Sequence, residues 1–164
     1  MLALEITNLK HFMNNLLTKD TFDDFLLREA TLLMGISYVI DGTYNSDFFT
    51  DEEKEQSACP FDYAAWSIVR PTMFDLIKGK KTPLAFQLTF YLPTNTSEKL
   101  LGQPLTACGV KSLVCNIKYD KNKILITSCI NYATFTLDKS LEPLWDSYLL
   151  EFLKKSEISF DALL

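Results

Sequence analysis

Apolar positions in the first part of the chain recur at two different periods. Leu2, Leu4 and Ile6 alternate with other residues, which predicts a short strand. The next apolar residues recur three and four positions apart, which is typical of one face of a helix, and Thr7 or Asn8 can cap that helix. This stripe consists of Leu9, Phe12, Met13, Leu16 and Leu17. The positions between them form the expected solvent side: Lys10, His11, Asn14 and Asn15.

Two further strands are predicted before residue 41. Residues 25–34 have a strand-like pattern, and residues 37–40 form a second strand after a turn at Gly35-Ile36. Asp41-Gly42 is the strongest short turn signal in the sequence, and it either closes a hairpin or ends a strand. Residues 46–56 are acidic and are expected to form a surface loop or short helix.

The middle of the chain combines a helix and a long strand. Pro71 disfavours an α conformation at Arg70, so the helix is expected to begin at Pro71 and to end at Gly79. Residues 84–92 then alternate cleanly between apolar and other side chains, which predicts a half-buried strand. A connection follows, with a short helix expected around residues 97–101.

The last third of the chain predicts a hairpin, one more strand and a helix. Residues 110–119 and 123–128 form the hairpin across Asp120-Lys121-Asn122, and residues 132–137 form the further strand. The final helix has an unbroken apolar stripe that we expect to face the sheet. The stripe contains Leu141, Leu144, Trp145, Tyr148, Leu149, Phe152 and Leu153.

This order of elements favours an α+β fold. Adjacent hairpins imply antiparallel pairing, and helices are too few for a doubly wound sheet. We therefore expect residues 1–164 to form a single α+β domain. It would contain one curved antiparallel sheet, or two, with about three helices packed on a face.

Composition narrows the class of protein. Hydrophobic residues make up 48% of the chain, which is ample for a packed core, and the formal net charge of −5 argues against broad, charge-driven coating of nucleic acid. The amino end lacks the basic region of a signal peptide, and the longest uncharged runs are fourteen residues, too short for a membrane span. We therefore expect a cytoplasmic protein without a membrane-spanning segment.

The residues that commonly carry chemistry form no recognisable motif. Cys59, Cys108, Cys115 and Cys129 include no C-x-x-C pair, and His11 is the single histidine, so we expect free thiols and neither a metal nor a cofactor. A three-residue loop would place Cys115 opposite Cys129 in the predicted hairpin, whereas a two- or four-residue loop would offset them by one. Acidic pairs such as Asp23-Asp24 lack calcium-loop spacing and are read as solvated surface charge.

One local concentration of positive charge is the candidate binding site. Lys78, Lys80 and Lys81 lie within four residues, and Arg70 precedes them by about two helical turns. These side chains can contact phosphate groups, and Trp66 can stack on a base or on a ligand ring. The same lysines can instead offset the partial negative charge at a helix C-terminus, and a tryptophan is more often part of a core.

The chain resembles a family of uncharacterised bacterial proteins, a domain of unknown function seen mainly in Firmicutes. Four stretches carry the resemblance: Tyr38-Val39-Ile40-Asp41-Gly42, Trp66-Ser67-Ile68-Val69-Arg70-Pro71, Leu76-Ile77-Lys78-Gly79-Lys80-Lys81-Thr82-Pro83 and Leu144-Trp145-Asp146. The resemblance covers nearly the full length and implies a cytoplasmic bacterial origin. It implies no activity, cofactor or partner.

The sequence therefore favours a non-enzymatic cytoplasmic binding or interaction module, with another protein as a candidate partner. One alternative is a nucleic-acid-associated accessory protein that uses Arg70, Lys78, Lys80 and Lys81. The opening strand and helix are also found in the domains of DNA sliding clamps, a likeness of topology alone. The other alternative is an enzyme of unrecognised type.

Overall fold

Seven strands form one antiparallel sheet in the computed structural model, which describes residues 1–55 and 62–163. In chain order the strands are β1 (Ala3–Ile6), β2 (Leu26–Leu33), β3 (Ser37–Asp41), β4 (Ala85–Tyr91), β5 (Val110–Asp120), β6 (Lys123–Tyr132) and β7 (Phe160–Ala162). Across the sheet their order is β3-β2-β4-β5-β6-β1-β7, and every neighbouring pair is antiparallel. The predicted α+β class is confirmed, with one sheet rather than two.

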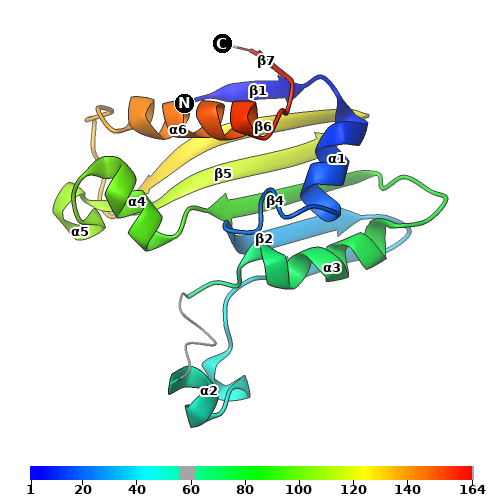
Figure 1. The fold of residues 1–164 in the computed structure, drawn as a ribbon, viewed down its shortest axis with the longest axis horizontal. Helices are drawn as coiled ribbons and strands as arrows, with labels where there is room; N and C mark the ends of the chain where they lie inside the picture. Colours follow the sequence, from blue (N-terminus) through cyan, green and yellow to red (C-terminus); the bar gives the residue numbers. More distant parts are fainter. Residues whose placement is uncertain (56–61, 164) are drawn as a thin grey trace.

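Three helices cover one face of this sheet (Figure 1). They are α1 (Leu9–Leu17), α3 (Trp66–Ile77) and α6 (Glu142–Lys155). The other described helical segments are shorter: η1 (Ser46–Phe48), α2 (Asp51–Glu55), α4 (Thr94–Leu101) and α5 (Leu105–Cys108). The expectation of about three helices on a face is thus met by the three longest of the described helices.

Strand register separates a buried face from a face that carries polar side chains. One row of paired residues runs across five strands and is buried beneath the helices: Ala30, Leu88, Ile117, Ile126 and Leu4. The adjacent row points to the opposite face: Thr31, Gln87, Lys118, Leu125 and Glu5. Because side chains alternate along each strand, the helices and the core lie on the same side of the sheet.

The final helix α6 packs on the sheet through much of its predicted stripe, although Leu144, a member of that stripe, is exposed. Trp145, Leu149 and Leu153 are buried in the core, and the indole Nε1–H of Trp145 donates a hydrogen bond of 3.0 Å to the Val114 carbonyl on β5. The prediction that Trp145 and Leu149 are among the most buried side chains is confirmed.

None of the helices in the described ranges combines the length and apolar character that a membrane span requires.

Asn15 lies inside the molecule, although the helical pattern placed it on the solvent side. Asn8 caps α1 as predicted, because its Oδ1 accepts a hydrogen bond from the backbone N–H of His11. Asn15 is buried because its own polar atoms find partners nearby. Its amide donates to the His11 carbonyl at 2.9 Å, and its Oδ1 accepts from the Thr21 hydroxyl at 2.7 Å. A hydrogen-bonded amide can be buried at little cost.

Helix α3 begins at Trp66, so the predicted start at Pro71 is wrong. Tertiary contacts fix the earlier start, since the backbone N–H of Trp66 donates to the Phe25 carbonyl at 2.8 Å. Pro71 lies inside the helix and removes one backbone donor, which would otherwise pair with the Ser67 carbonyl. Ser67 is exposed, so water can hydrate that carbonyl.

The hairpin between β5 and β6 closes with a two-residue turn. Lys121 and Asn122 both have positive φ, at 51° and 62°, which gives the twist that a tight hairpin requires. Asp120 therefore pairs with Lys123, and Cys115 and Cys129 are offset by one position. The offset places Cys115 in the core and leaves Cys129 exposed.

The strand predicted over residues 132–137 is wrong beyond Tyr132. Tyr132 pairs with Val110, the first residue of β5, and the chain before Val110 turns away at Gly109. In the described part of the chain, residues after 132 thus have no neighbouring strand to pair with, although threonine and aromatic residues favour one. Phe135 is exposed as a result.

Gly42 ends strand β3 and begins a projecting segment, so Asp41-Gly42 does not close a hairpin. The N–H of Gly42 donates to the Arg28 carbonyl at 3.0 Å, and the Gly42 carbonyl accepts from Ala64 at 2.8 Å. The first bond holds the glycine against β2, and the second joins it to Ala64. A Cβ at this position would lie 1.7 Å from the Leu27 carbonyl oxygen, so only glycine fits without a shift of the backbone.

Candidate functional site

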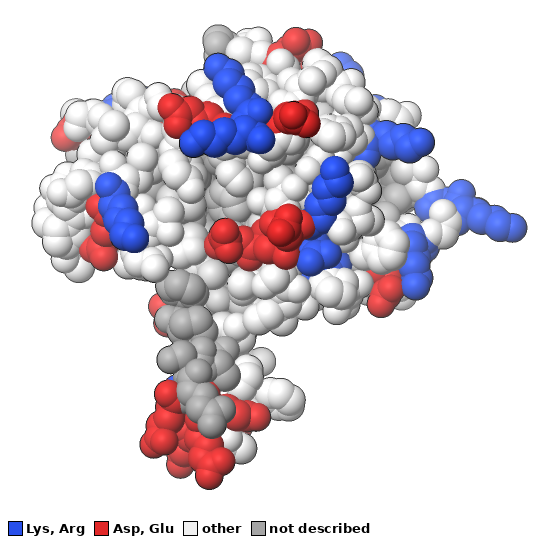
Figure 2. All heavy atoms as spheres, in the orientation of Figure 1, with Lys and Arg blue, Asp and Glu red and all other residues white. Residues whose placement is uncertain are grey.

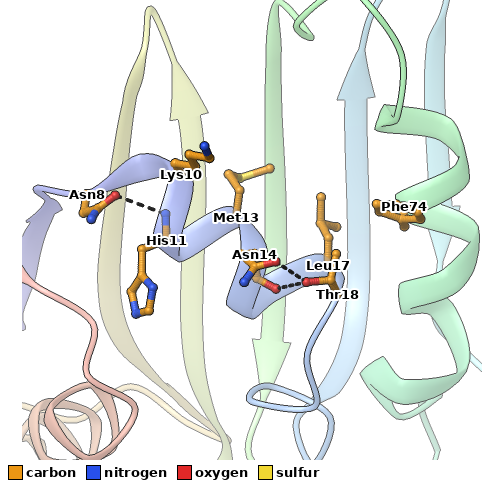
Figure 3. A pocket seen from close by; sticks show the side chains of 8 residues that line it. All are labelled: Asn8, Lys10, His11, Met13, Asn14, Leu17, Thr18 and Phe74. Carbon is orange, nitrogen blue, oxygen red and sulfur yellow. Dashed lines mark hydrogen bonds between the residues drawn. The ribbon is translucent and has the colours of Figure 1, made fainter.

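Two neighbouring hollows lie along helix α1. The larger has a volume of about 590 Å³ and lies between α1 and Phe74 of α3. Lys10 and Met13 project to one side of α1 and His11 to the other, while Phe74 points toward the C-terminal half of α1 (Figure 3). Lys10 and Met13 also line the second hollow, so the two hollows adjoin.

The second hollow has a volume of about 340 Å³ and lies where α1 meets the segment after α3. We call it the lysine-rimmed hollow. It is lined by Leu9, Lys10, Met13, Ile77, Gly79, Lys80, Lys81, Thr82, Pro83, Phe86 and Tyr119. Phe86 and Tyr119 belong to the buried core and stack with their ring centroids 5.2 Å apart. Lys10, Lys80 and Lys81 are exposed, so the hollow has apolar walls and a cationic rim.

Local sequence explains how two of these lysines reach the rim. Helix α3 ends at Ile77, and the N–H of Lys78 still donates to the Phe74 carbonyl at 2.8 Å. Gly79 then takes a φ of +145°, a region that glycine adopts readily. The chain thereby leaves the helix axis and carries Lys80 and Lys81 to the hollow before strand β4 begins.

The electrostatic character of this region differs from that of the chain as a whole. Among the described residues, no Asp or Glu lines either hollow, whereas the formal net charge of the chain is −5. Within the same described ranges, Lys10, Lys80 and Lys81 form no ion pair with a carboxylate. Their charges therefore remain available to an anionic ligand.

Arg70 and Lys78, two other predicted site residues, are each bound to a carboxylate. Arg70 makes a two-bond contact with Asp23, at 2.8 and 3.0 Å, and the two side chains are only 22% and 17% exposed. The hydrogen bonds to Asp23 raise the pKa of Arg70 above its usual value. Lys78 pairs with Asp75 at 3.0 Å on the surface of the same helix. Neither residue lines the lysine-rimmed hollow.

Trp66, the predicted stacking residue, is a core residue. Its side chain is 0% exposed, and its Nε1–H donates a hydrogen bond of 2.9 Å to the Leu16 carbonyl on α1. Its ring also makes an edge contact with Phe90. A base or ligand ring would have to displace core side chains to reach it. The structure thus places Lys80 and Lys81 at one hollow, which Trp66, Arg70 and Lys78 do not line.

Sequence reasoning missed Lys10 and a third, more polar hollow. The helical pattern predicts only that Lys10 lies on the solvent side of α1, and nothing in the sequence signals that it lines the same hollow as Lys80. The polar hollow, of about 730 Å³, is lined by residues from several distant segments, among them Tyr63, Tyr91, Glu98 and Lys111. Its charges are of both signs, and Glu98 Oε2 already accepts a hydrogen bond from the backbone N–H of Leu105 at 2.8 Å. The lining therefore lacks the single sign of charge that the rim of the lysine-rimmed hollow has.

The described thiols differ in their accessibility to solvent. Cys108, Cys115 and Cys129 are free, and Cys59 lies outside the described residues. Burial raises the pKa of the Cys115 thiol to about 12, so that it stays protonated and unreactive at neutral pH. Within residues 1–55 and 62–163, no three His, Cys, Asp or Glu side chains gather as metal ligands would.

Thiol labelling at pH 8 tests this assignment. A variant that retains only Cys115 is expected to react with Ellman's reagent at least about a thousandfold more slowly than one that retains only Cys129, because little of the buried thiol is ionised. Both variants should react fully in denaturant, which controls for the amount of thiol. Similar rates in the native state would contradict the burial of Cys115.

Comparison with known proteins places the chain in a family but assigns it no activity. Neither the curated proteins nor the solved structures contain a match to it. The profile of DUF5721, described as a family of unknown function, matches residues 15–161. This span includes α3, Lys80 and Lys81 but not Lys10. Since the match covers most of its length, the chain belongs to the DUF5721 family.

Proposed function

We propose that the protein is a non-enzymatic binding module whose ligand site is the lysine-rimmed hollow. The observation that supports this proposal is the combination of an apolar hollow with three ammonium groups, those of Lys10, Lys80 and Lys81. Such a site suits a ligand or partner segment that carries an apolar group and an anionic group together. The apolar group would be buried against Phe86 and Tyr119, and the anionic group would lie at the rim.

Size and charge both favour this class of ligand. The hollow, at about 340 Å³, lies at the lower end of the range of 300–1,000 Å³ that is typical of ligand pockets. Burial of an apolar group contributes affinity in proportion to the area removed from water, about 25 cal/mol per Å². Nearby ammonium groups add selectivity for an anion, because a neutral ligand of the same shape gains nothing from them.

The nucleic-acid alternative has one observation in its favour. Helix α1 contains no carboxylate and exposes Lys10 and Asn14, and its C-cap residue Thr18 is also exposed. Against it, Arg70 and Lys78 are each paired with a carboxylate, and α1 presents a single lysine. An affinity for duplex DNA that falls steeply with salt, and that replacement of Lys78, Lys80 and Lys81 abolishes, would favour this alternative.

Titration with decanoate, followed by ¹H–¹⁵N NMR, tests the proposal. Decanoate combines an apolar chain with one carboxylate, and decanol serves as its neutral counterpart. We expect decanoate to shift the amide resonances of Met13, Gly79 and Lys81, and decanol to bind at least about tenfold more weakly. The triple variant Lys10→Gln/Lys80→Gln/Lys81→Gln should lose the preference for decanoate over decanol.

Two controls separate the site from general charge and stability effects. Lys99, Lys118 and Lys139 are exposed and lie outside both hollows, so their triple change to Gln should leave decanoate binding unchanged. Arg70→Gln should lower the free energy of unfolding by about 1–2 kcal/mol and leave binding unchanged, because Arg70 contacts Asp23 rather than the hollow. Equal affinity for decanoate and decanol, or shifts remote from the hollow, would refute the proposal.

A further inference from the structure

A segment with strong negative charge projects from the body of the protein. Residues 43–55 follow Gly42, and at their base the Tyr44 N–H donates a hydrogen bond of 3.0 Å to the Asp62 carbonyl. Thr43 and Tyr63 form an isolated bridge beside it. We call residues 43–55 the acidic arm. Its helix α2 lies away from α1, α3 and the sheet (Figure 1).

Carboxylates gather at the tip of the acidic arm (Figure 2). Residues 47–55 contain five carboxylates and one lysine, Lys54; the carboxylates are Asp47, Asp51, Glu52, Glu53 and Glu55. Four of the five lie on α2, whose start is fixed by reciprocal hydrogen bonds. The Thr50 N–H donates to Glu53 Oε2 at 2.8 Å, and the Glu53 N–H donates to Thr50 Oγ1 at 3.1 Å. The charge is therefore held in an ordered element.

An exposed aromatic side chain accompanies this charge. Phe48 is 83% exposed, although its ring lies edge-on to that of Phe49, with the centroids 5.5 Å apart. Full burial of a phenylalanine side chain contributes roughly 1.5–3 kcal/mol to stability, and an exposed phenylalanine does not make this contribution. The tip thus combines an apolar group with anionic groups, which is the chemistry that the lysine-rimmed hollow would take.

The two surfaces cannot meet within one molecule. The hollow lies between α1 and the segment that follows α3, whereas α2 projects away from both helices (Figure 1). The hollow is apolar and cationic, and the tip is aromatic and anionic. Charge complementarity between two surfaces of the same chain points to contact between copies.

We propose that the acidic arm of one copy binds the lysine-rimmed hollow of a second copy, with Phe48 inserted between Met13 and Ile77 and with carboxylates of α2 at Lys10, Lys80 and Lys81. This inference rests on the proposed function, because it names the occupant of the same hollow. One side chain and a few carboxylates form a smaller contact than a stable interface, which buries at least roughly 1,200 Å², so we expect weak binding, with a dissociation constant on the order of 10 µM.

Sedimentation velocity over a range of protein concentrations tests the proposal, at low ionic strength of about 50 mM where charge attraction is least screened. We expect the wild-type protein to self-associate, and to dissociate as salt is raised. Lys10→Glu/Lys80→Glu/Lys81→Glu and Phe48→Ala/Glu52→Lys/Glu55→Lys should each weaken association by at least about a hundredfold. The arm variant keeps Glu53, so the hydrogen bonds that begin α2 remain.

Mixing the two variants gives the sharpest test. Each one retains the surface that the other has lost, so an equimolar mixture should form pairs although neither variant associates alone. The matched controls are Lys99→Glu/Lys118→Glu/Lys139→Glu for the hollow and Glu29→Lys/Glu151→Lys for the arm, all at exposed positions elsewhere. Both controls should associate like the wild type.

The results for self-association and for decanoate binding distinguish failure of this proposal from failure of the proposed function. A wild-type protein that stays monomeric but binds decanoate in the hollow would overturn self-association and leave the binding site standing. Association that survives both sets of substitutions would also overturn it, because the contact would then lie elsewhere. If the proposal holds, decanoate should dissociate the assembly by competing for the hollow.

Discussion

Replacement of Trp145 by alanine is expected to lower the free energy of unfolding by about 3–5 kcal/mol, the usual range for a large core aromatic residue. The side chain is 0% exposed and stacks on Tyr148 with centroids 5.7 Å apart. The substitution also removes the donor to the Val114 carbonyl on β5. It therefore combines a cavity with the loss of a buried hydrogen bond that joins α6 to the sheet.

Urea unfolding followed by circular dichroism measures this effect without relying on tryptophan fluorescence. Trp145→Phe should have an intermediate effect, because it keeps most of the ring contacts and loses the hydrogen bond. Leu144→Ala is a suitable control on the same helix, since Leu144 is 43% exposed, and we expect it to cost less than about 1 kcal/mol. Equal effects of Trp145→Ala and Leu144→Ala would show that α6 does not pack as described.

Gly42→Ala is expected to destabilise the protein by about 3–5 kcal/mol or to prevent folding. An added Cβ would lie 1.7 Å from the Leu27 carbonyl oxygen, and that oxygen belongs to the backbone of β2. Relief of the clash requires movement of a strand at the base of the acidic arm, which costs more than the rotation of a side chain. The hydrogen bonds from Gly42 to Arg28 and from Ala64 to Gly42 would lengthen at the same time.

Gly35→Ala is the matched control for this substitution. Gly35 lies in the turn between β2 and β3 and has no atom within 4 Å of a Cβ added there. Alanine at this position should be neutral, or should stabilise by up to about 1 kcal/mol through reduced freedom of the unfolded chain. Thermal unfolding of the two variants in parallel distinguishes a specific clash at Gly42 from a general cost of replacing glycine. Similar melting temperatures would contradict the close approach at Leu27.

Most of the regular elements could be predicted because their patterns are local. The stripe that contains Trp145 and Leu149 lies on one helix and needs no knowledge of its partner to be recognised. The predicted start of α3 at Pro71 was wrong because that start depends on Phe25, which lies forty residues earlier and binds the Trp66 backbone. Strand β7 was not predicted, since three residues pair only because β1 lies beside them.

The candidate site could be predicted only in part, for a related reason. Lys80 and Lys81 were identified because three lysines lie close together in sequence. The sequence does not reveal that Asp23 binds Arg70, nor that Lys10 lines the same hollow as Lys80. These relations depend on the packing of α1 against α3. The local sequence therefore shows where charged side chains cluster, whereas the fold determines whether each charge is paired or available to a ligand.

The position of strand β1 imposes a delay on the folding of the newly made chain. β1 is synthesised before the other described strands, yet its partners among them are β6 and β7, which emerge more than one hundred residues later. At roughly 5–20 residues per second, Leu4 and Ile6 wait on the order of ten seconds for the strands that pair with them. A chaperone that binds short apolar segments has that interval in which to act on the amino end. Truncation after α6 would leave β1 with an unpaired edge for as long as the fragment survives.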